Sequence, residues 1–200
     1  GNGLFHLTDP DEVFYALSAK EMILKNEWLT PYIFGQPQFE KPILTYWLLK
    51  MAMLFFGDNA FAIRFFPALF AILGVIGVYV LGMIGFISER RAFLAAFVMS
   101  TSIFYLAMGK SVFTDMIFSV FILYALLSFI VAYIYPKYKG IGFLGFYCFA
   151  ALATLTKGPL GLIIPLMSSV VFLAYVRQMR FLFSLWMLVG LMAYFLVAAP

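Results

Sequence analysis

The chain has 200 residues, of which 65% are hydrophobic and 11% are charged, and its formal net charge is +4. About a quarter of the residues of a soluble domain are charged, so a soluble fold of this size could not cover so much apolar surface. The sequence has neither a basic stripe nor a nucleic-acid recognition motif, and we expect no nucleic-acid partner. The composition predicts an all-α, multi-span integral membrane protein that contacts membrane lipid.

Residues 1–64 are expected to form an outer loop with two helices lying at the membrane surface. The first helix is predicted over residues 9–25, where Asp9 can cap the helix and Pro10 suits its first position. Asp11 and Glu12 then fall in the first turn, where acids complement the helix dipole. That complement is the purely structural interpretation of both carboxylates.

The second surface helix is predicted over residues 42–56. This segment is apolar enough to suggest a membrane span, but about 15 residues extend only ~22 Å as a helix. Lys50 also lies within it. We therefore expect an amphipathic helix at the interface, joined to the first by a turn at Gly35 and Pro37.

The rest of the chain consists of apolar runs separated by short polar connectors. A spanning helix needs roughly 17–25 apolar residues, and continuous rather than alternating runs exclude strands here. Six spans are predicted, at approximately 65–87, 92–109, 116–135, 141–156, 159–176 and 181–199.

The distribution of charge predicts how these spans are oriented. The connectors at 88–91, 136–140 and 177–180 share one face, and they hold six of the thirteen basic residues and a single acid, Glu89. An excess of Lys and Arg in short loops marks the cytoplasmic side. The other connectors, at 110–115 and 157–158, and residues 1–64 should then face the periplasm or exterior.

The outward start of the chain requires an earlier span to carry it across the membrane. The chain begins with Gly1 rather than Met and ends directly after an apolar run. We therefore expect a fragment of a longer protein, preceded by an apolar run of roughly 17–25 residues.

Four polar clusters interrupt the apolar background, and the predicted topology places all of them on the outer face. They lie at residues 8–12, 39–42, 110–115 and 156–159. Several carboxylates and lysines at one membrane–water interface indicate the handling of an anionic lipid headgroup. Lysines would hold a phosphate, while carboxylates would activate an acceptor or bind a divalent metal ion.

Each cluster also has a structural interpretation that the sequence leaves open. Glu40 and Lys41 could form an exposed, solvated pair, and Lys157 could extend from a helix end to the headgroups. Asp115 is flanked by long apolar runs, where a carboxylate is costly and indicates function. Its structural alternative is a pair with Lys110.

The ordered set of motifs resembles bacterial membrane glycosyltransferases related to the aminoarabinose transferase of lipid A and to protein O-mannosyltransferases. The motifs are Asp11-Glu12 with Tyr15, Phe39-Glu40-Lys41-Pro42 with Tyr46-Trp47, Phe56-Gly57, Thr114-Asp115-Met116 and Thr156-Lys157-Gly158-Pro159-Leu160-Gly161. A lone Asp-Glu pair would be weak evidence, but this order and spacing cover almost the whole chain.

The resemblance implies a GT-C-type membrane bundle in the bacterial inner membrane. Such enzymes take a sugar from a polyprenyl-phosphate donor and pass it to a lipid A-type, glycan or protein acceptor at the periplasmic face, here by inverting displacement. The implied catalytic residues are Asp11, Glu12 and Asp115, the implied substrate-binding residues are Tyr15, Lys41, Lys110 and Lys157, and the implied ligand of a divalent metal is Glu40.

Two positions depart from the pattern of the aminoarabinose transferases. Phe14 stands where these enzymes commonly have Arg, and Gln38 where an aromatic residue is common, so a specific lipid A assignment is weakened. A transporter or flippase of a lipid-linked substrate is the alternative. Transporters place their charged sites near the midplane, often in broken helices, whereas these clusters lie at one interface.

Overall fold

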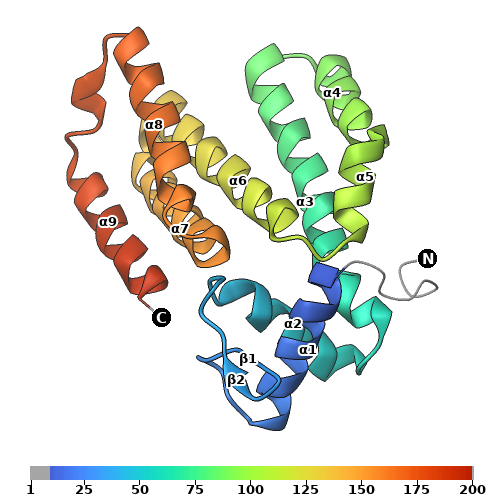
Figure 1. Ribbon diagram of the computed structural model, residues 1–200. Coiled ribbons are helices and arrows are strands. Elements are labelled where there is room, and N and C mark those ends of the chain that lie inside the picture. The colour runs from blue at the N-terminus through green and yellow to red at the C-terminus, as the bar shows by residue number, and fades with distance from the viewer. Residues whose placement is uncertain (1–9, 200) are drawn as a thin grey trace. The chain divides into compact units, whose positions relative to one another are not determined.

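The structure, a computed structural model (Figure 1), describes residues 10–199, with side chains from Glu12 onward. Their regular secondary structure is helical apart from one short hairpin, in agreement with the predicted all-α class. The chain divides into two compact units, with the boundary between Val120 and Phe121. Helix α6 crosses that boundary.

The first unit begins with the two helices and the turn that were predicted for residues 9–56. Its elements, up to the helix that leaves it, are α1 (Pro10–Leu24), β1 (Tyr32–Ile33), β2 (Gln36–Pro37), α2 (Leu44–Phe56), α3 (Ala60–Phe86), α4 (Glu89–Thr101), α5 (Ile103–Lys110) and α6 (Thr114–Ile134). The predicted turn is a small antiparallel hairpin in which Tyr32 pairs with Pro37. Gly35 has φ of +76° there, which glycine adopts without strain.

The end of α1 is fixed by its own backbone and by a lysine from α2. Asn26 adopts a left-handed conformation, and the amide of Glu27 donates to the carbonyl of Met22, which together form a Schellman-type end. Lys50 Nζ donates to the carbonyls of Met22 (3.1 Å) and Glu27 (2.7 Å) and lies 3.9 Å from the ring centroid of Trp28. Burial lowers the pKa of Lys50, and the Glu27 carboxylate opposes part of that shift.

One asparagine in the linker between α2 and α3 bonds to both helices. The Asn59 side chain accepts from the amide of Ala62 (2.9 Å) and donates to the carbonyl of Phe56 (2.7 Å), so it caps one helix and closes the other. Helix α3 therefore begins at Ala60, earlier than the predicted start at residue 65. The sequence signal for that start was a cap before an apolar run.

The predicted span at 92–109 is two helices rather than one. Helices α4 and α5 meet at an angle of 62°, and Ser102 between them has extended backbone. Just before the break, the hydroxyls of Ser100 and Thr101 donate to the carbonyl of Phe97. Such bonds compete with the helical ladder and bend helices, so this polar triplet ends α4 without a proline.

The second unit packs the end of α6 with three further helices. Its remaining elements are η1 (Pro136–Tyr138), α7 (Lys139–Lys157), α8 (Leu160–Tyr175), η2 (Met179–Phe181) and α9 (Leu185–Ala198). The core is aromatic: Phe129 contacts the rings of Phe146, Phe172 and Phe181 at centroid distances of 6.0–6.2 Å. Small residues let the helices approach closely, as is common in membrane bundles.

Three helical stretches in the described residues are long and apolar enough to cross a membrane. They are Ala60–Phe86, Thr114–Ile134 and Pro136–Lys157, and the bent pair α4–α5 would make a fourth. Helices α8 and α9 coincide with predicted spans but have 16 and 14 residues, at or below the usual minimum of about 17. Helix α2, predicted to lie at the interface, has 13 residues.

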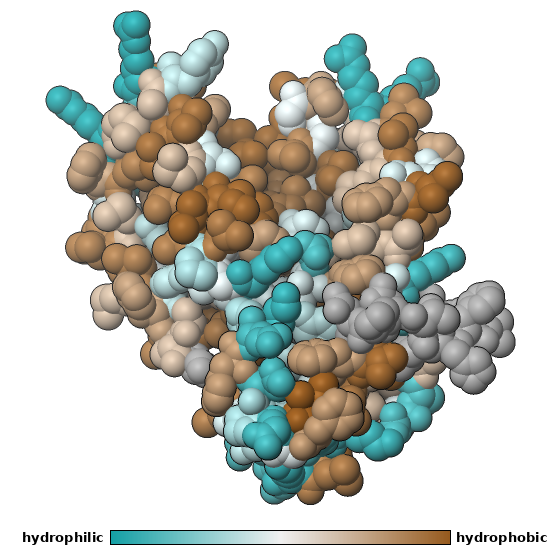
Figure 2. Space-filling model, viewed as in Figure 1, coloured by the Kyte–Doolittle hydropathy of each residue, from teal (hydrophilic) through white to brown (hydrophobic). Residues whose placement is uncertain are grey.

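The exposed surface of the helices is largely hydrophobic. Phe55 of α2, Phe104 of α5, Tyr175 of α8 and Leu196 of α9 are each more than 75% exposed. In Figure 2 the hydrophilic side chains gather at helix ends and over the α1–β1–β2–α2 segment, while brown, hydrophobic side chains cover the helix flanks. This pattern suits helices whose flanks contact lipid.

Candidate functional site

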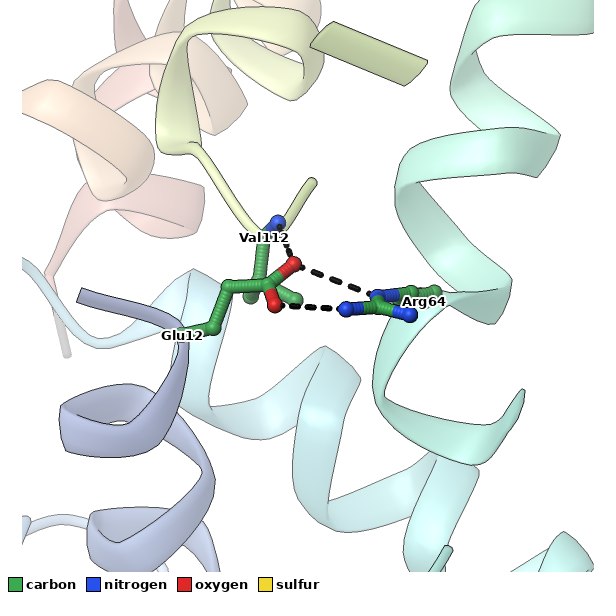
Figure 3. A network of polar contacts seen from close by, with 3 residues as sticks. All are labelled: Glu12, Arg64 and Val112. Carbon is green, nitrogen blue, oxygen red and sulfur yellow. Dashed lines mark hydrogen bonds and ion pairs between the residues drawn. The ribbon is translucent and has the colours of Figure 1, made fainter. Parts of the chain in front are cut away.

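Glu12, a predicted site residue of the first unit, is buried and bonded to two other elements. The residue is 2% exposed, and its carboxylate accepts from Arg64 Nη2 at 2.8 Å and Arg64 Nε at 3.3 Å. The backbone amide of Val112 donates to Glu12 Oε1 at 3.1 Å. Figure 3 shows the carboxylate held between the guanidinium and this amide. The ion pair is bidentate, the geometry that fixes direction as well as distance.

This network joins three elements that are far apart in the sequence. Glu12 lies in the first turn of α1, Arg64 in the second turn of α3, and Val112 in the turn between α5 and α6. Arg64 is the only charged residue of α3. Its position in an apolar helix was a signal that the sequence analysis missed, because such an arginine generally has a buried partner.

Asp115 follows directly on the turn that the network holds. It is the second residue of α6 and is partly buried, next to the buried Thr114. An acid in the first turn complements the positive end of the helix. The structure therefore brings the Asp115 segment to the start of α1, where the resemblance places the leading carboxylate.

The leading carboxylate itself, Asp11, lies beside Glu12 in the first turn of α1, as predicted. Its backbone is described, but its side chain lies outside the described part of the chain, as does the predicted cap Asp9. Its catalytic role stays a prediction.

Tyr15 lies one turn further along α1 and is buried. Its ring is 5.5 Å from the ring of Tyr46 on α2. Burial raises the pKa of Tyr46, and the charges of Tyr15 and Glu40 add to that shift. The Tyr46 hydroxyl is buried and has no hydrogen-bond partner among the described residues. A buried hydroxyl without a hydrogen-bond partner costs free energy unless a ligand or a water molecule bonds to it.

Glu40 and Lys41 lie in the segment between β2 and α2, and both are exposed. Glu40 acts electrostatically on Tyr46. No group of three His, Cys, Asp or Glu side chains in residues 12–199 could hold a metal ion. The described residues therefore do not form a divalent-metal site by themselves, and the metal role of Glu40 stays a prediction.

Lys110 lies at the end of an apolar cavity in the first unit. The cavity has a volume of about 270 Å³ and is lined by α3, the end of α4 and α5. Among the described residues that line it, Lys110 carries the charge, and the hydroxyl of Tyr105 donates to the carbonyl of Ala71 at 2.7 Å. An adjoining apolar cavity of about 280 Å³ shares Val75 and Ser100 with the first.

Lys157 belongs to the second unit. It is the last residue of α7 and is exposed, and a lysine there complements the negative end of the helix. Gly158 follows with φ of +79°, and its amide donates to the carbonyl of Thr154 at 2.7 Å. This turn fixes the backbone of the Lys-Gly-Pro motif.

The structure thus brings several predicted residues of the first unit into two groups. One joins Glu12 to the turn before Asp115, and the other joins Tyr15 to Tyr46 with Glu40 nearby. The contacts that define these groups do not include Lys41, Lys110 or Lys157.

Comparison with known families gives a match over most of the chain. Residues 40–200 match the family described as dolichyl-phosphate-mannose-protein mannosyltransferase. The matched range includes Glu40, Lys41, Lys110, Asp115 and Lys157, while Asp11 and Glu12 precede it.

Curated relatives match a similar stretch. The chain is 35% identical over 178 residues to an undecaprenyl phosphate-alpha-4-amino-4-deoxy-L-arabinose arabinosyl transferase 1 of Proteus mirabilis, covering 88% of this chain and 32% of that protein. It is 29% identical to the corresponding transferase of Serratia proteamaculans, over 87% of this chain and 32% of the relative. The chain therefore spans about a third of the length of these relatives.

Two solved structures share the fold. They are crystal structures of ArnT from Cupriavidus metallidurans, in the apo state and bound to undecaprenyl phosphate, with TM-scores of 0.87 and 0.92. Both cover 100% of this chain and 37% of the solved chain, at 22% and 21% identity. The likeness confirms the predicted helical, multi-pass membrane fold of the GT-C type.

Proposed function

This chain belongs to the dolichyl-phosphate-mannose-protein mannosyltransferase family, and from that premise we propose that it is part of a membrane glycosyltransferase. Its donor is a sugar carried on a polyprenyl phosphate. The observation that carries this proposal is the 35% identity, over 88% of the chain, to a relative named for transfer of aminoarabinose from undecaprenyl phosphate. The same relative favours an aminoarabinose-type sugar and a lipid A-type acceptor over a mannosylated protein.

The chemistry of the donor fits the carboxylates and lysines of the chain. The bond between the anomeric carbon and the phosphate oxygen breaks, and the polyprenyl phosphate leaves with the bonding electrons. Lysines neutralise that phosphate, so no dedicated general acid is needed. Lys41 and Lys157, both exposed, are the residues proposed for this task.

The acceptor attacks the anomeric carbon from the face opposite the phosphate, which inverts the configuration. If the acceptor is a hydroxyl, its proton passes to a carboxylate, and Asp11 and Asp115 are the residues proposed to take or orient it. If the acceptor is an ionised phosphate, no proton need move. The orphaned hydroxyl of Tyr46 is proposed to bond a polar group of the substrate.

The lipid part of the donor requires an apolar surface next to a cation. Lys110 at the end of the cavity between α3 and α5 meets that requirement. The Lys110 ammonium would add a further positive charge near the phosphate that Lys41 and Lys157 are proposed to neutralise. The lipid chain would enter the cavity, where burying apolar surface is worth about 0.8 kcal/mol per methylene.

The reaction is proposed to occur at the outer face of the bacterial inner membrane. Single cysteines placed by Gln38→Cys and Lys157→Cys in the full-length protein, in a background lacking Cys148, should react with an impermeant thiol reagent from outside. A cysteine placed by Lys139→Cys should not. If the Lys139→Cys variant were labelled and the other two were protected, the topology would be the reverse of the one predicted. The proposed site would then lie on the opposite side of the membrane from the donor's headgroup.

The function is tested by mass spectrometry of lipid A and of periplasmic glycoproteins from cells with and without the full-length protein. We expect lipid A to gain the mass of one aminosugar, and the Asp115→Asn variant at equal abundance to abolish most of that gain. If the sugar were found on proteins but not on lipid A, the acceptor would be a protein and not lipid A. Movement of the lipid-linked sugar across the membrane without any transfer would show a flippase and overturn the proposal.

A further inference from the structure

The first unit buries the ion pair between Glu12 and Arg64. Replacing a buried pair with apolar residues of similar volume is often neutral or stabilising, because both charges lose their hydration. Glu12 and Arg64 nevertheless occupy the interior, with side chains 3% and 9% exposed. Their presence is better explained by what the pair holds in place.

The other buried charge in the first unit differs from this pair in its contacts. Lys50 donates to the carbonyls of Met22 and Glu27 and so closes the end of α1. Its contacts are accounted for by the end of one helix and the turn that follows. Glu12 instead receives bonds from two elements that are 52 and 100 residues away in the sequence.

The bond to Val112 is the one that links the pair to the proposed chemistry. Val112 is buried in the turn that leads into α6, and Asp115 is three residues further on, within the first turn of that helix. Three residues can span at most about 10 Å, and helical backbone is stiff. A fixed Val112 amide therefore restricts where the Asp115 backbone can lie.

The same carboxylate belongs to the first turn of α1, directly after Asp11. One side chain thus fixes both the start of α1 and the turn before α6, and the guanidinium of Arg64 fixes that side chain at two points. Arg64 is anchored in turn in the long helix α3. The network therefore joins the start of α1, the second turn of α3 and the turn before α6, next to the backbones that carry Asp11 and Asp115.

We propose that Glu12 and Arg64 are positioning residues, which hold the backbones that carry Asp11 and Asp115 at a fixed separation through the Val112 amide. This inference rests on the proposed glycosyl transfer and deepens it. It gives Glu12 a role through other residues, in place of direct contact with substrate. A misplacement of about 1 Å in an active site can cost about 10²-fold in rate, which sets the scale of the expected effect.

The decisive variant is the double replacement Glu12→Leu with Arg64→Met in the full-length protein. It removes both charges together, so neither is left buried alone, and we expect its thermal stability to equal or exceed that of the wild type. We expect kcat to fall about 10–100-fold, with the KM for the polyprenyl-phosphate sugar changed less than threefold. A pair that serves stability alone would predict normal turnover in this variant.

Two further variants complete the set. Arg64→Lys keeps the charge but not the two-point contact, and kcat should fall about tenfold at wild-type abundance. Asp58→Asn removes the acid of the exposed pair with Lys20 in the same unit, and kcat should not change. Arg64→Lys also tests the proposal if the double variant fails to fold, since full turnover in Arg64→Lys would overturn it.

Hydrogen exchange separates this proposal from the proposed function. The amides of residues 111–115 should exchange faster in the double variant, while those of the unaltered α7 should not change. Normal protection of residues 111–115, or lost protection with normal turnover, would overturn the positioning role. Wild-type protein that protects these amides but transfers no sugar would instead refute the proposed function.

Discussion

The two units of the chain differ in what their interiors contain. The described interior of the first unit holds the charged side chains of Glu12, Lys50 and Arg64. Among the described residues of the second unit, the buried Thr156 and Ser169 donate their hydroxyls to carbonyls one turn earlier in their own helices. The first interior is organised by one buried ion pair and long-range hydrogen bonds. The second is organised mainly by apolar contact, with one hydrogen bond between the hydroxyls of Thr154 and Tyr194 at 3.1 Å.

The second unit shows how helices pack where no charge has to be held. Tyr133 and Phe129 stack together, and both contact the rings of Phe172 and Phe181. Polar groups that bond within their own helix place no demand on a neighbouring helix. Such a bundle suits the lipid interior, where each unsatisfied polar group costs several kcal/mol.

The contrast indicates where chemistry can be supported. Directed contacts between distant elements hold side chains in one geometry, whereas apolar packing tolerates exchange of one hydrophobic residue for another. The first unit carries seven of the eight predicted site residues, and only Lys157 belongs to the second. We therefore expect the two units to fail in different ways when they are mutated.

The largest effect is expected in the first unit from Asp11→Asn, which keeps the size of the side chain but removes its basicity. General-base catalysis contributes about 10²–10⁴-fold, so turnover should fall within that range while abundance is unchanged. Steady-state transfer by the full-length protein measures this, with Asp58→Asn as the matched exposed-acid control. Near-normal turnover would remove Asp11 from the mechanism and leave only a helix-dipole role.

A smaller effect is expected from the lysines proposed to contact phosphate. Lys41→Met and Lys157→Met keep an apolar stem and remove the charge. A hydrogen bond to a charged group is worth about 1.5–3 kcal/mol, so the apparent affinity for the donor should fall about 10–100-fold. Donor titrations measure it, with the exposed Lys137→Met as control. Unchanged affinity in both variants would favour headgroup contact and helix-dipole roles for these lysines.

The second unit should be most sensitive to added volume. A Cβ on Gly161 would lie 2.2 Å from the backbone nitrogen of Thr154 and 2.4 Å from the carbonyl carbon of Ala153, so α7 and α8 would have to separate. Overpacking costs about 1–3 kcal/mol or more, and the thermal midpoint of Gly161→Ala should fall accordingly. Gly85→Ala, at a helical site with nothing within 4 Å, should be neutral or slightly stabilising. Equal behaviour of the two variants would contradict the close helix contact.

The smallest of these effects is expected from the buried lysine of the first unit. Lys50→Met removes the charged donor from the carbonyls of Met22 and Glu27 but keeps an apolar chain, so stability should fall by about 1–2 kcal/mol. Amide exchange at residues 22–28 should increase without a change at α7. The exposed Lys20→Met should cost less than about 1 kcal/mol. A variant at Lys50 as stable as the wild type would show that these bonds are replaced by water.

The sequence by itself determined the membrane class, the two short helices before the first long one, and the polar motifs. These features depend on local information: the length of an apolar run, a capping residue, and a glycine or proline at a turn. The family resemblance followed from the same motifs. Even the early start of α3 at Ala60 was encoded locally, in Asn59.

Only the tertiary structure decided which residues meet. Nothing near Glu12 in the sequence shows that its partners are Arg64 and Val112, because both bonds depend on how the helices between them pack in three dimensions. The burial of Lys50 was decided in the same way. Helix propensity and hydropathy act over one or two turns, whereas a buried charge finds its partner through the packing of whole elements. The positions of the helices along the sequence were therefore predictable, and the Glu12–Arg64–Val112 contacts that join them were not.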